Sequence, residues 1–302
     1  MPTDAPVPDF REIAGRPTVR VERHYPHPID KVWTAVTDPH HLGQWFPSPV
    51  EVDLRPGGAM RFTAFEGEDG AAGEVDEVDA PRRLSFRWGD DHLTFDLTSH
   101  EGGTTFALTH SFDDRYGGPS FATGWEMCLG GLRSVLAGDP APPPSRGIER
   151  HEALVHEFGL DAPEVTRTDA GWTVRVERQL TCPAEVAWNL WMGLDQITGE
   201  QRSAPDVGEV MTPYMAPDVV IGTMTEVDAY RVMAFDIAPT GGPGDHLRLE
   251  LTEGTGHGAR IVVTVTGTRP AECDEAADTW GAGAVGHLAA MAASWAQSTA
   301  DG

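Results

Sequence analysis

Two hydrophobic patterns alternate along this chain. Strict alternation is typical of strands with one buried face, and a spacing of three and four residues is typical of helices. Valine alternates with charged side chains in residues 18–23 and again in 173–178, which predicts a half-buried strand at each place. Helical spacing follows in residues 29–37, where we expect a short helix that ends before Asp38-Pro39. The first folded segment therefore opens with a strand and a helix.

A series of short strands is expected after this helix. Gly, Pro and Asp cluster between the alternating runs, and such short turns join antiparallel neighbours. The runs lie at residues 60–64, 84–88, 93–97 and 106–110. A wide apolar stripe from Phe121 to Leu136 then predicts a long helix, which Gly138 and Pro140 end.

The chain contains an internal repeat. The hexapeptide Thr-Val-Arg-Val-Glu-Arg occurs at 18–23 and at 173–178, and the same separation relates Trp125 to Trp280. Further matches keep their order across the whole segment, which indicates that a domain was duplicated. The two halves are therefore expected to share one fold.

The repeated unit predicts an α+β protein. A sheet with one apolar face and a helix with one apolar stripe bury both surfaces by packing against each other. We therefore expect two tandem domains, at 17–138 and 170–298, each a curved antiparallel sheet wrapped around a long C-terminal helix. Residues 139–169 between them hold the sequence Ala-Pro-Pro-Pro-Ser and a pattern that favours a short connector helix.

Composition narrows the possible partners. The 302 residues include 47 acidic and 22 basic side chains, a net charge of −25 that repels nucleic acid at long range. No apolar run is long enough to insert into a membrane, and the N-terminus lacks a secretory signal pattern, so we expect a cytoplasmic protein. The three cysteines are far apart, which supports neither a disulfide framework nor a zinc site. We expect no metal and no cofactor.

Several motifs of the first half resemble a known family. Four stretches carry the likeness: VERHYPHPIDKVWTAVTDP from Val21 to Pro39, Gln44-Trp45-Phe46-Pro47, Arg55-Pro56-Gly57-Gly58 and Gly124-Trp125-x-x-Cys128-Leu129. They are similar to the family related to the C-terminal domain of the activator of the 90-kDa heat-shock protein ATPase. That family lies within the SRPBCC superfamily of START-like, birch-pollen-allergen-like helix-grip proteins. The second half keeps the opening strand and the closing helix but has neither Trp-Phe-Pro nor Arg-Pro-Gly-Gly.

The resemblance implies a cavity between the sheet and the closing helix that holds an apolar molecule. Candidate lining residues share the parity of the buried strand faces or the helix stripe. They are Trp88, Phe95, Phe106, His110, Trp125, Cys128 and Leu129 in the first domain, and Tyr214, Met224, Phe235, Trp280, Gly283 and His287 in the second. Aromatic residues at this spacing are also ordinary core, so a lining role and a core role both stay open.

Three of these residues have side chains that can do chemistry. His110 shares the buried face of its strand and can act as an acid or base, although a histidine reaching solvent at the strand end is the alternative. His287 lies on the second closing helix, at the position of Leu132 in the first, and either reaches the cavity or bonds a nearby carbonyl. Cys128 has no basic neighbour in sequence, which favours core packing over nucleophilic catalysis.

The second closing helix differs from the first in having many small residues between 281 and 290. Small residues either bring a helix closer to its sheet or leave space behind. The second half is also rich in methionine, whose flexible thioether suits irregular apolar pockets. We therefore expect the larger cavity in the second domain.

Three functions follow from this sequence. The first is binding of a small hydrophobic or amphipathic molecule in one or both cavities, with no covalent step. The second is an aromatase or cyclase acting on a polyketide in the same cavity without a cofactor, because tandem helix-grip enzymes of similar length do so. The third is a protein-interaction module linked to a chaperone, by analogy with the activator.

Overall fold

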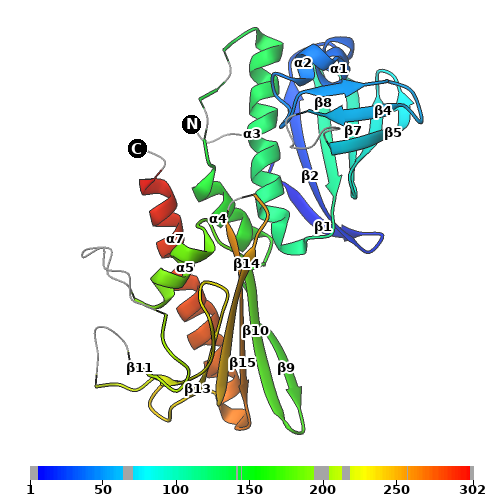
Figure 1. Ribbon diagram of the computed structural model, residues 1–302. Coiled ribbons are helices and arrows are strands. Elements are labelled where there is room, and N and C mark those ends of the chain that lie inside the picture. The colour runs from blue at the N-terminus through cyan, green and yellow to red at the C-terminus, as the bar shows by residue number, and fades with distance from the viewer. Residues whose placement is uncertain are drawn as a thin grey trace. The chain divides into compact units, whose positions relative to one another are not determined.

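The structure is a computed structural model that describes residues 6–63, 71–140, 142–143, 145–193, 204–212, 218–256 and 258–299. The chain divides into two compact units, Met1–Gly147 and Ile148–Gly302. Each unit contains one antiparallel sheet and a long helical segment that follows its last strand (Figure 1).

The first unit has an eight-stranded sheet with the order β1-β2-β8-β7-β6-β5-β4-β3. Its strands are β1 (Asp9–Ile13), β2 (Arg16–Tyr25), β3 (Val50–Val52), β4 (Ala59–Phe62), β5 (Ala71–Asp79), β6 (Arg83–Trp88), β7 (Asp91–His100) and β8 (Gly103–Ser111). All neighbouring strands are antiparallel, and β2 pairs with β8, so the first long strand closes against the last.

Three helices complete this unit: α1 (Ile29–Thr37), α2 (Pro39–Leu42) and α3 (Gly118–Ala137), the last preceded by a 3₁₀ turn at Arg115–Gly117. The Asp38 carboxylate accepts hydrogen bonds from the backbone of His40 and His41, which caps α2. Gly138 ends α3 in the left-handed region, with φ of 74°, a conformation that costs glycine little.

The core of the first unit lies between the inner face of the sheet and α3. Val19 and Val21 of β2 and Leu108 of β8 are fully buried, as the alternating pattern predicted. From α3, Leu129 and Leu132 fill the other side. In Figure 1 α3 runs beside β2, the strand against which it packs.

The second unit has a seven-stranded sheet with the order β11-β12-β13-β14-β15-β10-β9. Its elements are α4 (Ile148–Glu157), β9 (Glu164–Thr168), β10 (Gly171–Gln179), α5 (Ala184–Trp191), β11 (Val210–Met211), β12 (Gly222–Asp228), β13 (Val232–Ile237), β14 (His246–Glu253), β15 (Ala259–Gly267), a 3₁₀ turn (Pro270–Glu272), α6 (Cys273–Ala276), the π-helical segment η3 (Ala277–Val285) and α7 (Gly286–Ser298).

The two sheets have the same topology over seven strands, because β9, β10 and β15 to β11 stand in the order of β1, β2 and β8 to β4; β3 is the additional strand of the first sheet. Even the register agrees. Thr18 pairs with Ser111 across β2 and β8, and Thr173 pairs with Thr266 across β10 and β15, at the separation seen in the sequence repeat. The predicted α+β fold of two tandem helix-grip domains is confirmed.

A shared irregularity makes the same point. The register of β5 on β6 shifts between Val75 and Glu77, and that of β12 on β13 shifts between Met224 and Glu226. Both irregularities fall at equivalent places of the two sheets, beside the pairs Val75 with Phe86 and Met224 with Phe235. These pairs give an alignment of the two units that does not depend on sequence identity.

The closing helices differ. In the second unit nine residues, Ala277–Val285, form a π-helix, whose wider turns accommodate an additional residue. Beyond it, the buried positions Val285 and Leu288 repeat the spacing of Leu129 and Leu132 one residue later than the repeat separation predicts. The predicted match of His287 with Leu132 is therefore wrong. Leu288 takes that place, and the inserted residue is the reason.

Candidate functional site

A cavity of about 340 Å³ lies in the second unit, between the sheet, α5 and the closing helix. This volume is within the range of small-molecule sites, about 300–1,000 Å³. The residues that line it are mainly aliphatic, aromatic or thioether side chains: Leu190, Trp191, Gly193, Met211, Ile221, Phe235, Trp280, Ala284, His287, Leu288 and Met291. An apolar molecule that enters such a site gains the free energy of burying its surface.

Two aromatic side chains form rigid parts of this wall. Phe235 comes from β13 and is fully buried. Trp280 comes from the π-helical segment, and its indole N–H donates a hydrogen bond of 2.9 Å to the carbonyl of Pro243. The two rings approach edge to face, with centroids 6.3 Å apart. Because the indole N–H is already satisfied, Trp280 presents its apolar surface to the cavity.

Among the described lining residues, His287 is the one with an ionisable side chain. It is exposed, so its imidazole lies toward solvent at the cavity wall. No carboxylate of the described residues forms a hydrogen bond or ion pair with it. In the described part of the chain, no group of three or more His, Cys, Asp or Glu side chains is arranged to hold a metal ion.

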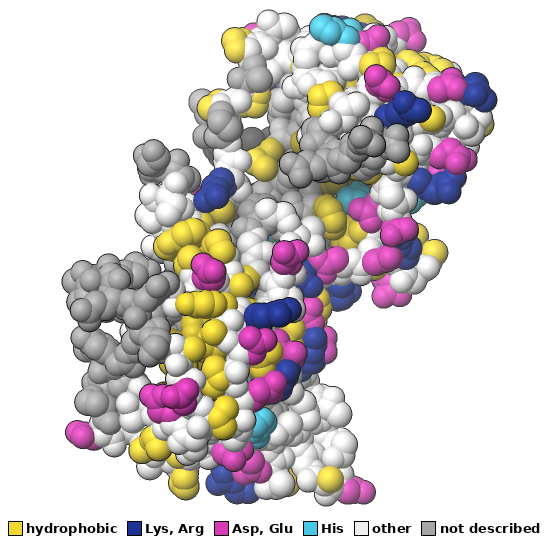
Figure 2. Space-filling view, viewed as in Figure 1, with side chains coloured by type: hydrophobic (Ala, Val, Ile, Leu, Met, Phe, Trp, Pro, Cys, Tyr) yellow, Lys and Arg dark blue, Asp and Glu magenta, His cyan; other side chains and the backbone are white. Residues whose placement is uncertain are grey.

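Figure 2 shows hydrophobic side chains gathered over α5 and α7 on the face of the second unit turned to the viewer. Trp191 of α5 and Met291 of α7 are partly buried and also line the cavity. The apolar lining therefore reaches the surface.

Some of the residues predicted to line the cavity of this unit do so, and others lie elsewhere. Phe235, Trp280 and His287 line the cavity. Met224 is buried in the adjacent core, and Gly283 is exposed on the π-helical segment. Tyr214 lies outside the described residues.

Residues of α5 and of the sheet edge also line the cavity, and the sequence patterns did not predict them. Leu190 and Trp191 are the last two residues of α5. Met211 is the last residue of β11, and Ile221 directly precedes β12. The apolar end of α5, Trp-Asn-Leu-Trp-Met, was a signal for the first two. The short strand β11 has no such pattern, because only tertiary pairing with β12 positions Met211.

In the first unit, a cluster of aromatic rings occupies the equivalent place. The Phe46 ring lies at the centre of the cluster, with centroids 5.5 Å from both Trp88 and Trp125. Trp88 also stacks on Phe62 at 4.4 Å, and Phe95 meets Phe106 edge to face at 5.3 Å.

The predicted residues of α3 belong to this packed interior. Leu129 is buried, and its carbonyl accepts a 3.0 Å hydrogen bond from the hydroxyl of Tyr25. Burial raises the pKa of Cys128 to about 12, so its thiol stays protonated and unreactive at neutral pH.

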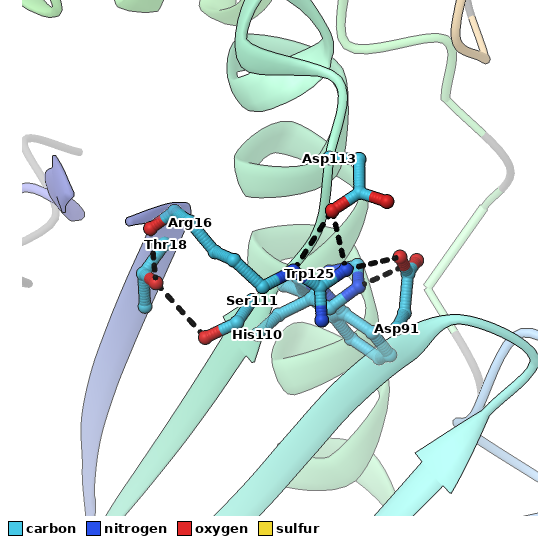
Figure 3. Close-up of polar contacts among 7 residues, drawn as sticks. All are labelled: Arg16, Thr18, Asp91, His110, Ser111, Asp113 and Trp125. Carbon is cyan, nitrogen blue, oxygen red and sulfur yellow. Dashed lines mark hydrogen bonds and ion pairs between the residues drawn. The ribbon is translucent and has the colours of Figure 1, made fainter. Parts of the chain in front are cut away.

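His110 is the buried centre of a polar cluster that extends to the surface (Figure 3). Its Nε2 lies 2.9 Å from Oδ2 of Asp91, and the indole N–H of Trp125 donates to its Nδ1 at 3.1 Å. Arg16 extends the cluster, with an ion pair of 2.8 Å to Asp113 and a longer one of 4.0 Å to Asp91.

This geometry fixes the tautomer of His110. The Trp125 N–H can only donate, so Nδ1 of His110 must accept and Nε2 must carry the proton that it donates to Asp91. Both ring nitrogens are therefore engaged within the protein. In this conformation neither is directed at a bound molecule.

The alternative of a solvent-reaching His110 is wrong, since the residue is only 2% exposed. Its carboxylate partner was also missed. Leu93 pairs with His110 across β7 and β8, and Asp91 precedes Leu93 by two residues on the same strand face. Diagonal neighbours of this kind are within reach of long side chains. The parity of Asp91 was visible in the sequence, but the register that brings it to His110 was not.

Comparison with known proteins gives a match for the first unit. Residues 26–137, a little over a third of the chain, match the sequence model of the family described as "Activator of Hsp90 ATPase homolog 1-like protein". The first unit resembles the activator family. Together with the fold, this match confirms the predicted resemblance to an SRPBCC protein.

Similar solved structures correspond to about half of the chain. The crystal structure of CalU16 from Micromonospora echinospora is 29% identical, covers 49% of this chain and 94% of its own, and has a TM-score of 0.42. The solution structure of CalU16 is 27% identical, with coverage of 52% and 99% and a TM-score of 0.43. A conserved protein of unknown function from Enterococcus faecalis, EF2215, is 21% identical, with coverage of 50% and 90% and a TM-score of 0.44. No curated protein matches the chain significantly.

The activator-like motif around Gln44-Trp45-Phe46-Pro47 supplies rings to the first core. The Trp45 indole N–H donates to the carbonyl of Ala35 at 2.9 Å, which anchors the segment to α1. Phe46, the next residue, then reaches the centre of the aromatic cluster. The second unit lacks this motif, and its cavity lies among the equivalents of the residues that surround Phe46.

Among the described helices, none is long and apolar enough to cross a membrane.

Proposed function

We propose that the second unit binds a small, uncharged apolar molecule in the cavity lined by Phe235, Trp280 and Met291. The observation that carries this proposal is an apolar cavity of about 340 Å³ at the place that the Phe46 ring and its neighbours occupy in the first unit. An empty apolar cavity costs stability, because the atoms that line it lose packing partners. A bound molecule restores those contacts.

Charge and lining together limit the class of molecule. The net charge of −25 repels anions at long range, and the described lining residues include one imidazole and no Lys or Arg that would hold an anion. Burial of apolar surface, at about 25 cal/mol per Å², then supplies most of the binding free energy. A neutral molecule with at most one hydrogen-bonding group near His287 fits these conditions.

The test uses N-phenyl-1-naphthylamine, an uncharged fluorescent probe of apolar sites. We expect saturable binding to the full chain and loss of that binding in Ala284→Phe, which fills the cavity from the helix side. Ala282→Phe is the matched control, since Ala282 lies on the same segment but is exposed. Equal binding by both variants, or no saturable binding by the unchanged chain, contradicts the proposal.

The aromatase or cyclase alternative makes a different demand. It requires an acid or base directed at the guest, and His287 is the lining side chain with that chemistry. His287→Ala is expected to leave probe affinity within about threefold, because the side chain is exposed and the affinity comes from apolar burial. Turnover of a poly-β-keto substrate that disappears in His287→Ala would favour the enzyme instead.

A further inference from the structure

We infer that the guest of the second unit is an aromatic molecule, whose ring takes the place that the Phe46 side chain holds in the first unit. This inference rests on the proposed function, because it names the class of molecule that enters the same cavity. It comes from comparing the two copies of the fold within one chain.

The Phe46 ring is held by other rings. Its centroid lies 5.5 Å from Trp88 and from Trp125, and 6.4 Å from Phe86. It also stacks on Phe62 at 6.0 Å. These residues come from β4, β6 and α3, so Phe46 is a ring enclosed between the sheet and the closing helix.

The strand register identifies the same place in the second unit. Phe86 pairs with Val75 beside the register shift of the first sheet, and Phe235 pairs with Met224 beside that of the second. Trp280 is the repeat partner of Trp125. Phe235 and Trp280 both line the cavity, so the empty space of the second unit is bounded by the equivalents of two residues that contact Phe46.

The second unit supplies no ring of its own from the matching segment. Residues 192–209, between α5 and β11, contain no Phe, Trp or Tyr. The surrounding sheet has also lost rings. Ile237 pairs with Gly222 as Trp88 pairs with Gly73, and Leu249 stands at the position of Phe95.

The rings that remain are placed where they touch a guest. Phe235 and Trp280 are retained while the neighbouring aromatic positions have become aliphatic. Edge-to-face and offset contacts between rings add stabilisation beyond burial of area. An apolar cavity of about 150 Å³ holds benzene, so the roughly twofold larger cavity here suits a molecule of about two fused rings.

The test compares two neutral alcohols of similar size, 2-naphthol and 1-decanol, by isothermal titration calorimetry with the full chain. Both carry one hydroxyl, and the aliphatic alcohol is the more hydrophobic. We expect 2-naphthol to bind about tenfold more tightly. Equal affinity, or tighter binding of 1-decanol, overturns the aromatic preference and leaves the proposed function standing. If neither alcohol binds, the proposed function fails and this inference fails with it.

Paired variants locate the preference. Phe235→Leu removes a ring from the cavity wall, and Phe86→Leu makes the same change at the equivalent position of the first unit. We expect Phe235→Leu to weaken 2-naphthol about tenfold and 1-decanol by less than twofold, and Phe86→Leu to change neither. A loss of equal size for both alcohols, in protein with native circular dichroism, contradicts the inference.

A third experiment creates a cavity in the first unit. Phe46→Ala removes the internal ring, and we expect the 2-naphthol stoichiometry to rise from one to two per chain. A folded Phe46→Ala protein that still binds one equivalent contradicts the equivalence of the two places. Should Phe46→Ala fail to fold, the Phe235→Leu comparison decides alone.

Discussion

At the scale of single residues, the two copies of the fold differ at a buried polar side chain. His110 of the first unit pairs with Leu93, and the equivalent pair in the second unit is Leu247 with Val265. The first unit therefore holds an imidazole where the second has a hydrocarbon. Such a change is tolerated only when every buried donor finds an acceptor.

His110→Val is expected to destabilise the first unit by about 1–3 kcal/mol, because it leaves the buried indole N–H of Trp125 without an acceptor. Trp125→Phe removes that donor. The double variant should therefore lose less than the sum of the two single losses, and urea titrations of all four proteins measure this coupling. Strictly additive losses would show that the hydrogen bond contributes nothing.

The three cysteines should be inert in the native protein. Burial raises the pKa of Cys128 and of Cys182 to about 12, and Cys273 is only 1% exposed. Since the thiolate is the reactive form, we expect negligible labelling by a disulfide reagent at pH 8 and three labelled thiols after denaturation. Rapid native labelling of any one of them would contradict this burial.

At the scale of elements, α4 and the π-helical segment distinguish the second unit from the first. Helix α4 packs on α7 through a buried face that includes Leu154 and Val155. On the same helix, Glu152 forms an ion pair of 2.6 Å with Arg178 of β10. This ion pair holds α4 to the sheet, and the apolar packing holds it to the closing helix.

The Glu152 contact predicts a pH dependence. Burial opposes the charge on this carboxylate, but the hydrogen bond with His151 and the charge of Arg178 outweigh burial and lower its pKa below the ordinary 4.5. A lowered folded pKa contributes stability above the unfolded value, and that contribution is lost as the pH falls through the folded pKa. Stability should therefore fall as the pH drops below about 4.5.

Glu152→Gln should reduce this loss of stability at low pH, which thermal melts between pH 7 and pH 3 measure. Glu149→Gln is the control, because Glu149 is exposed on the same helix. If stability falls equally steeply with pH in Glu152→Gln and in the unchanged protein, the Glu152 carboxylate is excluded as the cause of the fall.

At the scale of the whole molecule, the chain is one topology built twice with two different interiors. Aromatic rings pack the first interior, and the second has a cavity lined in part by Phe235 and Trp280. Duplication followed by divergence at the Trp-Phe-Pro motif accounts for this difference without any change of fold. A protein interior has few voids unless side-chain volume is removed.

The boundary of the second domain is open to test. The sequence analysis placed it at 170, whereas the compact unit begins at Ile148 and includes α4. We expect the fragment 148–302 to fold and to bind the apolar probe. Fragment 170–302 should be less stable because α7 loses the packing of α4. Circular dichroism and urea titration compare the two fragments, and equal stability would favour the boundary at 170.

Much of the architecture follows from local patterns. Strand alternation, the stripe of the closing helix and the repeated hexapeptide depend on neighbouring residues and on one constant separation, so they predicted two domains of one fold. Strand alternation placed Phe235 on an inner face, and the apolar stripe of the closing helix did the same for Trp280. Both residues line the cavity.

Other features depended on contacts between distant segments. The partnership of Asp91 with His110 requires the register of β7 on β8, and the position of His287 requires the π-helical insertion. Whether a ring is core or lining depends on the volume of every neighbour, as Phe46 shows in one unit and the cavity shows in the other. The sequence by itself determined which faces are buried, because burial has a period. Only the tertiary structure decided what fills the space between those faces, because packing is a sum over side chains that meet from far along the chain.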